Sequence, residues 1–262
     1  MRHYLTIGLL FSALLIGCQK EAIIEPNASF SFRGDTSSVI KMATYDTCTI
    51  FNTSINADSS FWDIGNGNIS TTENLVLTFP KSGTYNLKLT VKTNDGQKSS
   101  LDKKVIVLDR ILKKITINYI QWDTIPNSIP GFNCVWPATS TADVFVLVQE
   151  CAPNDSIVPI SGIMPNSTIL YQSPLIQNVS YRTFIPIQID VPERIVVDKK
   201  MVLDRSFVIS LMAKDKQGVI YALQTSKFGG SSIGIKKESF EDNKFIVVSS
   251  LTSSLEFDCR FE

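Results

Sequence analysis

The feature that most constrains the fold of this chain is an alternation of apolar and polar side chains with a period of two. It is clearest over residues 84–92, TYNLKLTVK, where every second side chain is apolar. Because successive side chains of a β-strand point to opposite faces, this pattern predicts a strand with one face on a core and one in water. Residues 28–33 alternate in the same way, and so do residues 254–261, where Cys259 falls on the apolar face. Such half-buried strands are typical of antiparallel sheets.

The rest of the chain continues as short strands separated by turns. The Asp95–Gly96 pair is a strong hairpin signal. Further strands are expected over residues 103–109, 113–122, 143–149, 168–173, 183–189, 206–215 and 244–250. No stretch of a dozen residues shows a helical period with caps, so the sequence predicts an all-β protein built from two β-sandwich domains.

The stretch FWDIGNGNIS, residues 61–70, holds the most specific motif of the first half. The Trp62-Asp63-x-Gly65-x-Gly67 turn follows a strand that begins ASFSF and precedes SGTYNLKLTVKTNDG and KKVIVLD. Taken in this order, the pieces resemble a PKD domain over residues 27–109. The resemblance implies a seven-stranded, immunoglobulin-like sandwich, usually an extracellular spacer or binding module.

The motif can be interpreted as structural or as a calcium or ligand loop. In the structural interpretation Trp62 fills the space between the sheets, Asp63 accepts hydrogen bonds from turn amides, and the glycines permit positive φ. Asn66 stands where the resemblance implies an aspartate, and the run NLVLTF, residues 74–79, replaces the usual histidine and tyrosine. Calcium prefers several carboxylate oxygens, so Asn66 favours the structural interpretation.

Residues 110–262 form the second predicted domain. The pieces KKITINYIQW, ADVFVLV, ILYQSPLIQN and SFVISLMAKD resemble a β-sandwich that follows PKD domains in lipoproteins of Bacteroidetes. That module resembles calcium- and phospholipid-binding sandwiches, in which loop aspartates hold calcium. Asp123, Asp143 and Asp215 are the nearest candidates, but Gln217 stands where a second acid would follow Asp215. Three scattered acids make a poor cation cage, so no metal site is expected.

The N-terminus carries the signals of an exported, lipid-anchored protein. Residues 1–17 combine a cationic start with an apolar run that is too short for a bilayer, which needs about 20 residues. The run ends in Leu15-Ile16-Gly17-Cys18, which resembles a bacterial lipobox and implies cleavage before Cys18 and lipidation of its thiol. Residues 18–26 would form a tether. Gln19 is not the aspartate associated with inner-membrane retention, so we expect an outer-membrane lipoprotein on the periplasmic or cell-surface face.

The composition that remains after residue 17 excludes several classes of function. Removing Arg2 and His3 leaves 24 basic residues, 25 acidic residues and no histidine. The balanced charge argues against nucleic acid as a partner. Without a histidine, Ser-His-Asp and Cys-His catalysis and histidine-ligated zinc are excluded. No acid pair stands out for glycoside hydrolysis, since Glu193, Asp198 and Asp204 look like strand-end or turn charges. We therefore expect a chain that is not an enzyme and has no cofactor.

Four cysteines remain besides the predicted lipid attachment site. They are Cys48, Cys134, Cys151 and Cys259, and no two of them have the short spacing of a metal site. Export permits disulfides, and four cysteines allow three pairings between which the sequence does not decide. Free buried thiols remain the alternative.

Three aromatic residues flank or occupy the long loop over residues 123–142, and they are the candidates for ligand contact. They are Trp122, Phe132 and Trp136. Aromatic side chains in loops can stack on sugar rings or fill a partner's pocket, and the alternative is that they cap the sandwich core. The expected function is a non-catalytic binding, adhesion or scaffold module of the cell envelope. The alternative is a glycan-capturing accessory lipoprotein of a polysaccharide-utilisation system, so the expected partner is a glycan or another envelope protein.

Overall fold

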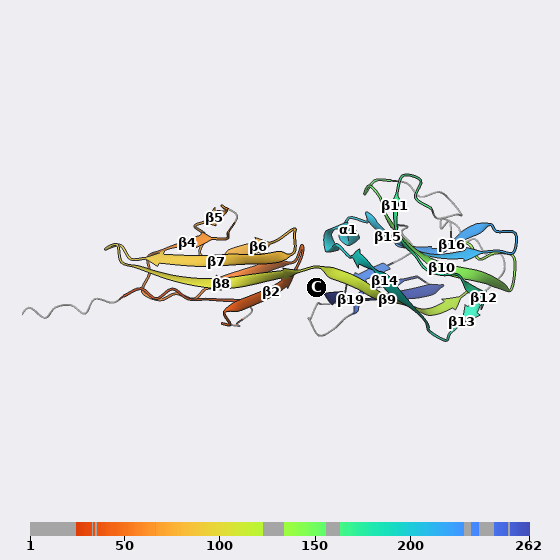
Figure 1. Cartoon of the computed structure of the whole chain (residues 1–262), viewed down its shortest axis with the longest axis horizontal. Helices are drawn as coiled ribbons and strands as arrows, with labels where there is room; N and C mark the ends of the chain where they lie inside the picture. Colours follow the sequence, from red (N-terminus) through yellow and green to blue (C-terminus); the bar gives the residue numbers. More distant parts are fainter. Residues whose placement is uncertain are drawn as a thin grey trace, which may run out of the picture. The chain divides into compact units, whose positions relative to one another are not determined.

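The computed structural model describes residues 25–32, 34, 36–65, 67–122, 134–155, 163–227, 232–235, 244–250 and 252–262. Across these residues the regular secondary structure consists of β-strands and one short helix (Figure 1). That helix is neither long nor apolar enough to cross a membrane. The prediction of an all-β protein with sandwich domains is therefore confirmed.

The contacts within the chain define two compact units. The first comprises the described residues within Met1–Thr36, Ile50–Leu75 and Leu87–Asp102, and the second comprises those within Ser37–Thr49, Val76–Asn86 and Lys103–Glu262.

Two sheets are formed by the strands up to residue 108. One has the order β1 (Phe30–Phe32), β3 (Thr47–Asn52) and β6 (Leu75–Thr78). The other has the order β2 (Val39–Ala43), β8 (Lys98–Leu108), β7 (Gly83–Lys92), β4 (Ser59–Asp63) and β5 (Ile69–Ser70). β2 pairs with β8 in parallel, which the long stretch of chain between them permits.

Two further sheets are formed by the strands from residue 110 onwards. One has the order β11 (Thr168–Gln172), β10 (Thr141–Glu150), β15 (Phe207–Lys214) and β16 (Ile220–Thr225), with β12 (Ile176–Ser180) also on β10. The other has the order β13 (Arg182–Thr183), β9 (Arg110–Gln121), β19 (Ser253–Phe261), β18 (Lys244–Ser249) and β17 (Ser232–Ile235), with β14 (Ile187–Val196) also on β9. Apolar side chains from both sheets form one buried core.

The alternation read from the sequence places side chains as expected. In β7 the side chains of Leu87, Leu89 and Val91 are buried and those between them are exposed or half-buried. The hairpin turns at residues 93–97, where Gly96 has a φ of 91°. In β19 Cys259 is buried, which confirms its inward direction.

Two local features differ from the prediction. The expected strand over 183–189 is divided into β13 and β14, with Pro186 between them, because proline cannot donate to a ladder. A helix that periodicity did not predict, α1 (Lys199–Leu203), is capped by Asp198, whose carboxylate accepts hydrogen bonds from the amides of Lys200 and Met201. Five residues are too few to show a helical period, although an aspartate is a favoured N-cap.

Candidate functional site

The glycine turn of FWDIGNGNIS has a structural role. Trp62 is fully buried and meets Phe30 edge to face, with ring centroids 5.2 Å apart. The Asp63 carboxylate accepts a hydrogen bond of 2.9 Å from the amide of Gly65. Gly65 and Gly67 have φ values of 77° and 76°, which glycine adopts at little cost. The structural interpretation of these residues is confirmed, while Asn66 lies outside the described residues.

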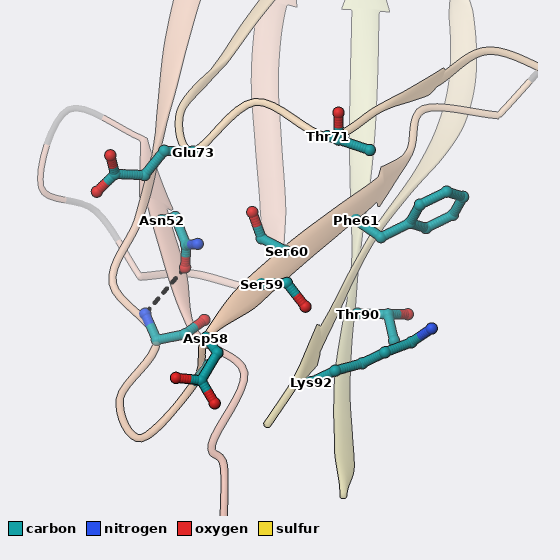
Figure 2. A pocket seen from close by; sticks show the side chains of 11 residues that line it. Asn52, Asp58, Ser59, Ser60, Phe61, Thr71, Glu73, Thr90 and Lys92 are labelled. Atoms are coloured by element: carbon teal, nitrogen blue, oxygen red, sulfur yellow. Dashed lines mark hydrogen bonds between the residues drawn. The ribbon is translucent and has the colours of Figure 1, made fainter. Parts of the chain in front are cut away.

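A groove of about 660 Å³ lies beside β4 in the first compact unit (Figure 2). Its volume falls within the range of about 300–1,000 Å³ that is typical of ligand pockets. Polar side chains dominate its lining, together with one aromatic ring. The lining residues are Asn52, Ser54, Ala57, Asp58, Ser59, Ser60, Phe61, Thr71, Glu73, Thr90 and Lys92.

The groove is open because, among the described strands, β4 has a full partner on one side only. β7 pairs with β4 along its whole length, from Ser59 to Asp63. On the other side β5 pairs only with Trp62 and Asp63. A strand edge that lacks a neighbour presents unpaired main-chain groups. Ser59 to Phe61 therefore form an open edge along the groove.

The segment 71–73, which lines the groove, is hydrogen-bonded to the buried Trp62. The carbonyl of Thr72 accepts a hydrogen bond of 2.9 Å from the indole Nε1 of Trp62 and one of 3.4 Å from Ser60 Oγ. Thr72 is thereby fixed, and its neighbours Thr71 and Glu73 contribute side chains to the lining. The buried tryptophan therefore holds one wall of the groove.

The end of β3 extends this wall on the same side of β4. The Asn52 Oδ1 atom accepts a hydrogen bond of 3.0 Å from the amide of Ser54, which Figure 2 shows as a dashed line. The amide of Asn52 donates in turn to Asn74 Oδ1 at 3.1 Å. Asn52 Nδ2 has no partner within the described residues, so this amide retains a donor for a ligand.

The charges of the groove are mixed. Asp58 Oδ2 accepts a hydrogen bond of 2.7 Å from the amide of Asn94, so that this carboxylate is partly engaged. Glu73 and Lys92 form no ion pair with any part of the chain that the structure describes. The groove thus has two carboxylates and one ammonium group, without the basic excess that an anionic ligand requires.

The aromatic ring of the groove belongs to Phe61, which is 38% exposed. Trp62 points into the core, so the alternation along β4 directs Phe61 to the opposite face. Its cross-strand partner is Thr90, whose hydroxyl lies 3.1 Å from that of Ser100. Because a threonine is too small to cover a phenyl ring, Phe61 keeps a face for contact.

The aromatic residues that the sequence analysis proposed for ligand contact lie elsewhere. Trp122 and Trp136 are 1% and 0% exposed and belong to the core of the second unit. The indole Nε1 of Trp136 donates to the carbonyl of Thr139 at 2.7 Å. A buried indole presents no face to a ligand. The expectation that Trp122 and Trp136 contact a ligand is therefore corrected. Phe132 and Cys18 lie outside the described residues.

The candidate calcium ligands of the second unit are engaged in local hydrogen bonds. Asp143 accepts from the amide of Asn178 at 3.0 Å. Asp215 accepts from the amides of Gln217 and Val219 and from the Tyr221 hydroxyl. No group of three or more acidic, histidine or cysteine residues among the described positions is arranged to hold a metal ion. Asp123 lies outside those positions.

The four cysteines that follow residue 18 are free thiols. Cys48, Cys151 and Cys259 are buried, and Cys134 is half-buried. Burial raises the pKa of the Cys134 thiol to about 11. This thiol is therefore protonated at neutral pH and a weak nucleophile.

Comparison with known proteins identifies the first sandwich. Residues 24–107 match the family model of the PKD domain. No curated protein matches the chain significantly. The PKD1 domain of the Vibrio cholerae metalloprotease PrtV is 26% identical over 32% of this chain and 98% of that domain, with a TM-score of 0.26.

Two other structures are similar over more of the chain. A structure of carbohydrate-binding modules from the β-sandwich superfamily is 12% identical and covers 91% of this chain and 98% of that one, with a TM-score of 0.29. The Bacteroides ovatus protein SGBP-B, in complex with a mixed-linkage heptasaccharide, is 12% identical and covers 87% of this chain and 65% of that one, with a TM-score of 0.25. The PKD domain that the motifs predicted at the N-terminal side is thus supported by the family match.

Proposed function

We propose that this chain is a lipid-anchored protein of the bacterial outer membrane that binds a ligand without catalysing a reaction. Cys18 carries the lipid, and residues 18–26 connect it to a PKD domain at 27–109. A second sandwich follows at 110–262. The signal-like start, the lipobox-like Leu15-Ile16-Gly17-Cys18 and the PKD match support this arrangement.

The groove beside β4 is the observation that carries the proposal. It brings together side chains from β3, β4, β7 and the segment 71–73, and several of their polar groups lack partners within the described residues. Polar groups that are already positioned together in the unliganded protein can form hydrogen bonds with a ligand at little cost in reorganisation. Binding is the activity that such an arrangement supports best.

Hydrolysis of a bound glycan is the competing function for this groove, since it contains Asp58 and Glu73. Glycosidases keep one carboxylic acid protonated by surrounding it with apolar groups. Both carboxylates of the groove are exposed to water, which does not provide such surroundings. Binding without cleavage is therefore favoured over hydrolysis.

The anchor is tested in cells that express the chain with Cys18 or with Cys18→Ser. The intact chain should be recovered in the outer-membrane fraction with a lipid mass on its first residue, and the variant should not. Protease treatment of intact cells then distinguishes the surface face from the periplasmic face. A wild-type chain that is recovered without lipid would contradict the anchor.

The groove is tested with the soluble chain that begins at residue 19 and with envelopes from the bacterium that encodes it. Binding should weaken by at least about tenfold, equivalent to about 1.4 kcal/mol, when Asn52 and Lys92 are both changed to Ala. Phe51→Ala is the matched control, because Phe51 is 47% exposed in the same unit but does not line the groove. Equal binding by all three proteins would reject the groove as the binding site.

A further inference from the structure

We propose that the groove beside β4 binds a neutral glycan segment, with a sugar ring stacked on Phe61 and its hydroxyls bonded to the groove's polar groups. This inference rests on the proposed function and specifies the ligand of the same site. Four properties of the groove support it: its aromatic face, its hydrogen-bonding groups, its charge and its course across β4.

The aromatic face is provided by Phe61. Its ring is partly exposed at the rim of the groove, and the small Thr90 is its neighbour on β7. One face of a pyranose ring is lined by C–H groups, which pack on the electron-rich face of an aromatic ring. A phenylalanine has no hydroxyl or amide of its own, so this part of the groove selects for an apolar surface.

The groove offers both the donors and the acceptors that sugar hydroxyls need. A sugar hydroxyl both donates and accepts, as do the hydroxyls of Ser59 and Thr71. The Asn52 amide donates, the Glu73 carboxylate accepts and the Lys92 ammonium donates. Within the part of the chain that the structure describes, these five side chains form one hydrogen bond that a ligand would have to displace, the one that Asn52 Oδ1 accepts from the main-chain amide of Ser54.

The charge of the groove selects for a neutral ligand. Two carboxylates, of Asp58 and Glu73, stand against the single ammonium group of Lys92. A phosphate or a uronic acid polymer would meet a net negative surface, and like charges repel in a partly desolvated site. Neutral hexose or pentose polymers have no such cost.

The course of the groove favours an extended chain. In Figure 2 Asn52 and Glu73 lie on one side of β4, and Phe61 and Lys92 lie on the other. A ligand that contacts both groups must cross the open edge at Ser59 to Phe61. A peptide that added a strand to this edge would find only these three residues to pair with, since Trp62 and Asp63 are already paired with β5. A glycan needs no such ladder.

The experiment measures the soluble chain in affinity gels that contain neutral or acidic polysaccharides. The neutral probes are mixed-linkage β-glucan, xylan, mannan and dextran, and the acidic probe is polygalacturonate. At least one neutral polymer should retard the chain and polygalacturonate should not. Phe61→Ala should raise the Kd by about tenfold or more, Phe61→Trp should retain or tighten binding, and Phe51→Ala should bind as the wild type does.

Binding to envelopes that have been treated with periodate or with protease shows whether the glycan inference alone fails or the proposed function fails as well. Periodate cleaves vicinal diols of sugars, so it should abolish groove-dependent binding, while protease should leave it intact. Binding could instead be lost in the Asn52→Ala/Lys92→Ala variant, be sensitive to protease and be resistant to periodate. That result would identify the ligand as a protein and not a glycan, and the proposed function would still hold. Binding to no envelope and no polymer would overturn both. Retention of full affinity by Phe61→Ala, with a neutral polymer bound, would overturn the stacking role.

Discussion

The indole Nε1 of Trp62 donates a hydrogen bond of 2.9 Å to the main-chain carbonyl of Thr72. This bond connects the most deeply buried side chain of the glycine-turn motif to the segment that forms one wall of the groove. The tryptophan therefore has two roles: its ring fills the core against Phe30, and its N–H fixes the position of Thr71 and Glu73. Trp62 therefore belongs to the motif that indicates the fold and also supports the candidate binding groove.

The first prediction concerns this shared residue. Trp62→Phe removes the indole N–H and part of a buried ring, and should lower the free energy of unfolding by about 2–4 kcal/mol. It should also weaken ligand binding, because the carbonyl of Thr72 loses its hydrogen bond to the buried indole. Chemical denaturation and a binding titration measure the two effects.

Phe30→Leu is the matched control for that prediction. It removes the edge-to-face partner of Trp62 but leaves the bond to Thr72 in place. We expect a loss of stability of about 1–2 kcal/mol and unchanged ligand affinity below the unfolding transition. If Phe30→Leu and Trp62→Phe weakened binding equally, the bond to Thr72 would not be the cause.

The second prediction concerns a buried charge in the second unit. Arg110 is fully buried and donates to the carbonyl of Thr44 at 3.0 Å and to Asp46 Oδ1 at 2.7 Å. Asp46→Ala deprives the guanidinium of its carboxylate, and we expect a loss of about 3 kcal/mol in the free energy of unfolding. Arg194→Ala, which breaks a pair between a largely exposed guanidinium and Asp109, should cost at most about 1 kcal/mol. Equal effects in urea unfolding would contradict this account.

The third prediction concerns the thiols. Cys48, Cys151 and Cys259 are buried, and the pKa of Cys134 is raised to about 11, so only about one Cys134 thiol in a thousand is ionised at pH 8. Iodoacetamide at about pH 8 should therefore label none of the four quickly in the folded chain and all four in urea. Rapid labelling of the native chain would contradict the protection of the thiols. Two cysteines that are labelled in urea only after a reductant is added would show a disulfide and contradict the free thiols.

The fourth prediction concerns stability in acid. A hydrogen bond from the Ser206 hydroxyl, supported by one from Lys200, holds the pKa of Asp204 below its ordinary value of 3.8. Because the folded pKa is lower than the unfolded one, the stabilisation is present above about pH 4 and is lost as the pH falls through the folded pKa. Asp204→Asn should be less stable than the wild type at pH 7, and this difference should shrink near pH 2. Urea unfolding at the two pH values measures it, and a difference that grew in acid would contradict the assignment.

The strands were predictable where a single residue period governs burial. In β7 and over the C-terminal part of β19 the apolar side chains are buried and the polar ones between them are half-buried or exposed, so the alternation in the sequence matches the burial. The turn at Gly65 and Gly67 was predictable for a similar local reason, since positive φ limits the choice of residue. α1 was missed because five residues are too few to show a helical period.

The groove was not predictable because it results from strand order. Nothing in the sequence of β4 indicates that β5 stops after pairing with Trp62 and Asp63 and leaves Phe61 beside an open edge. The only local sign was the position of Phe61 on the face opposite Trp62. The opposite error occurred at Trp122 and Trp136, where strands distant in the sequence enclose side chains that flank a loop.

The central claim is that ligands bind at the open edge of β4. The most direct test is a titration of the ¹⁵N-labelled soluble chain with an oligosaccharide of whichever neutral polymer retards it, followed by two-dimensional NMR. We predict shifts at the amides of Ser59 to Phe61 and Thr71 to Glu73 and at the indole N–H of Trp62, because that group bonds to Thr72. Shifts confined to residues 110–262, with an unchanged Trp62 indole signal, would contradict the account.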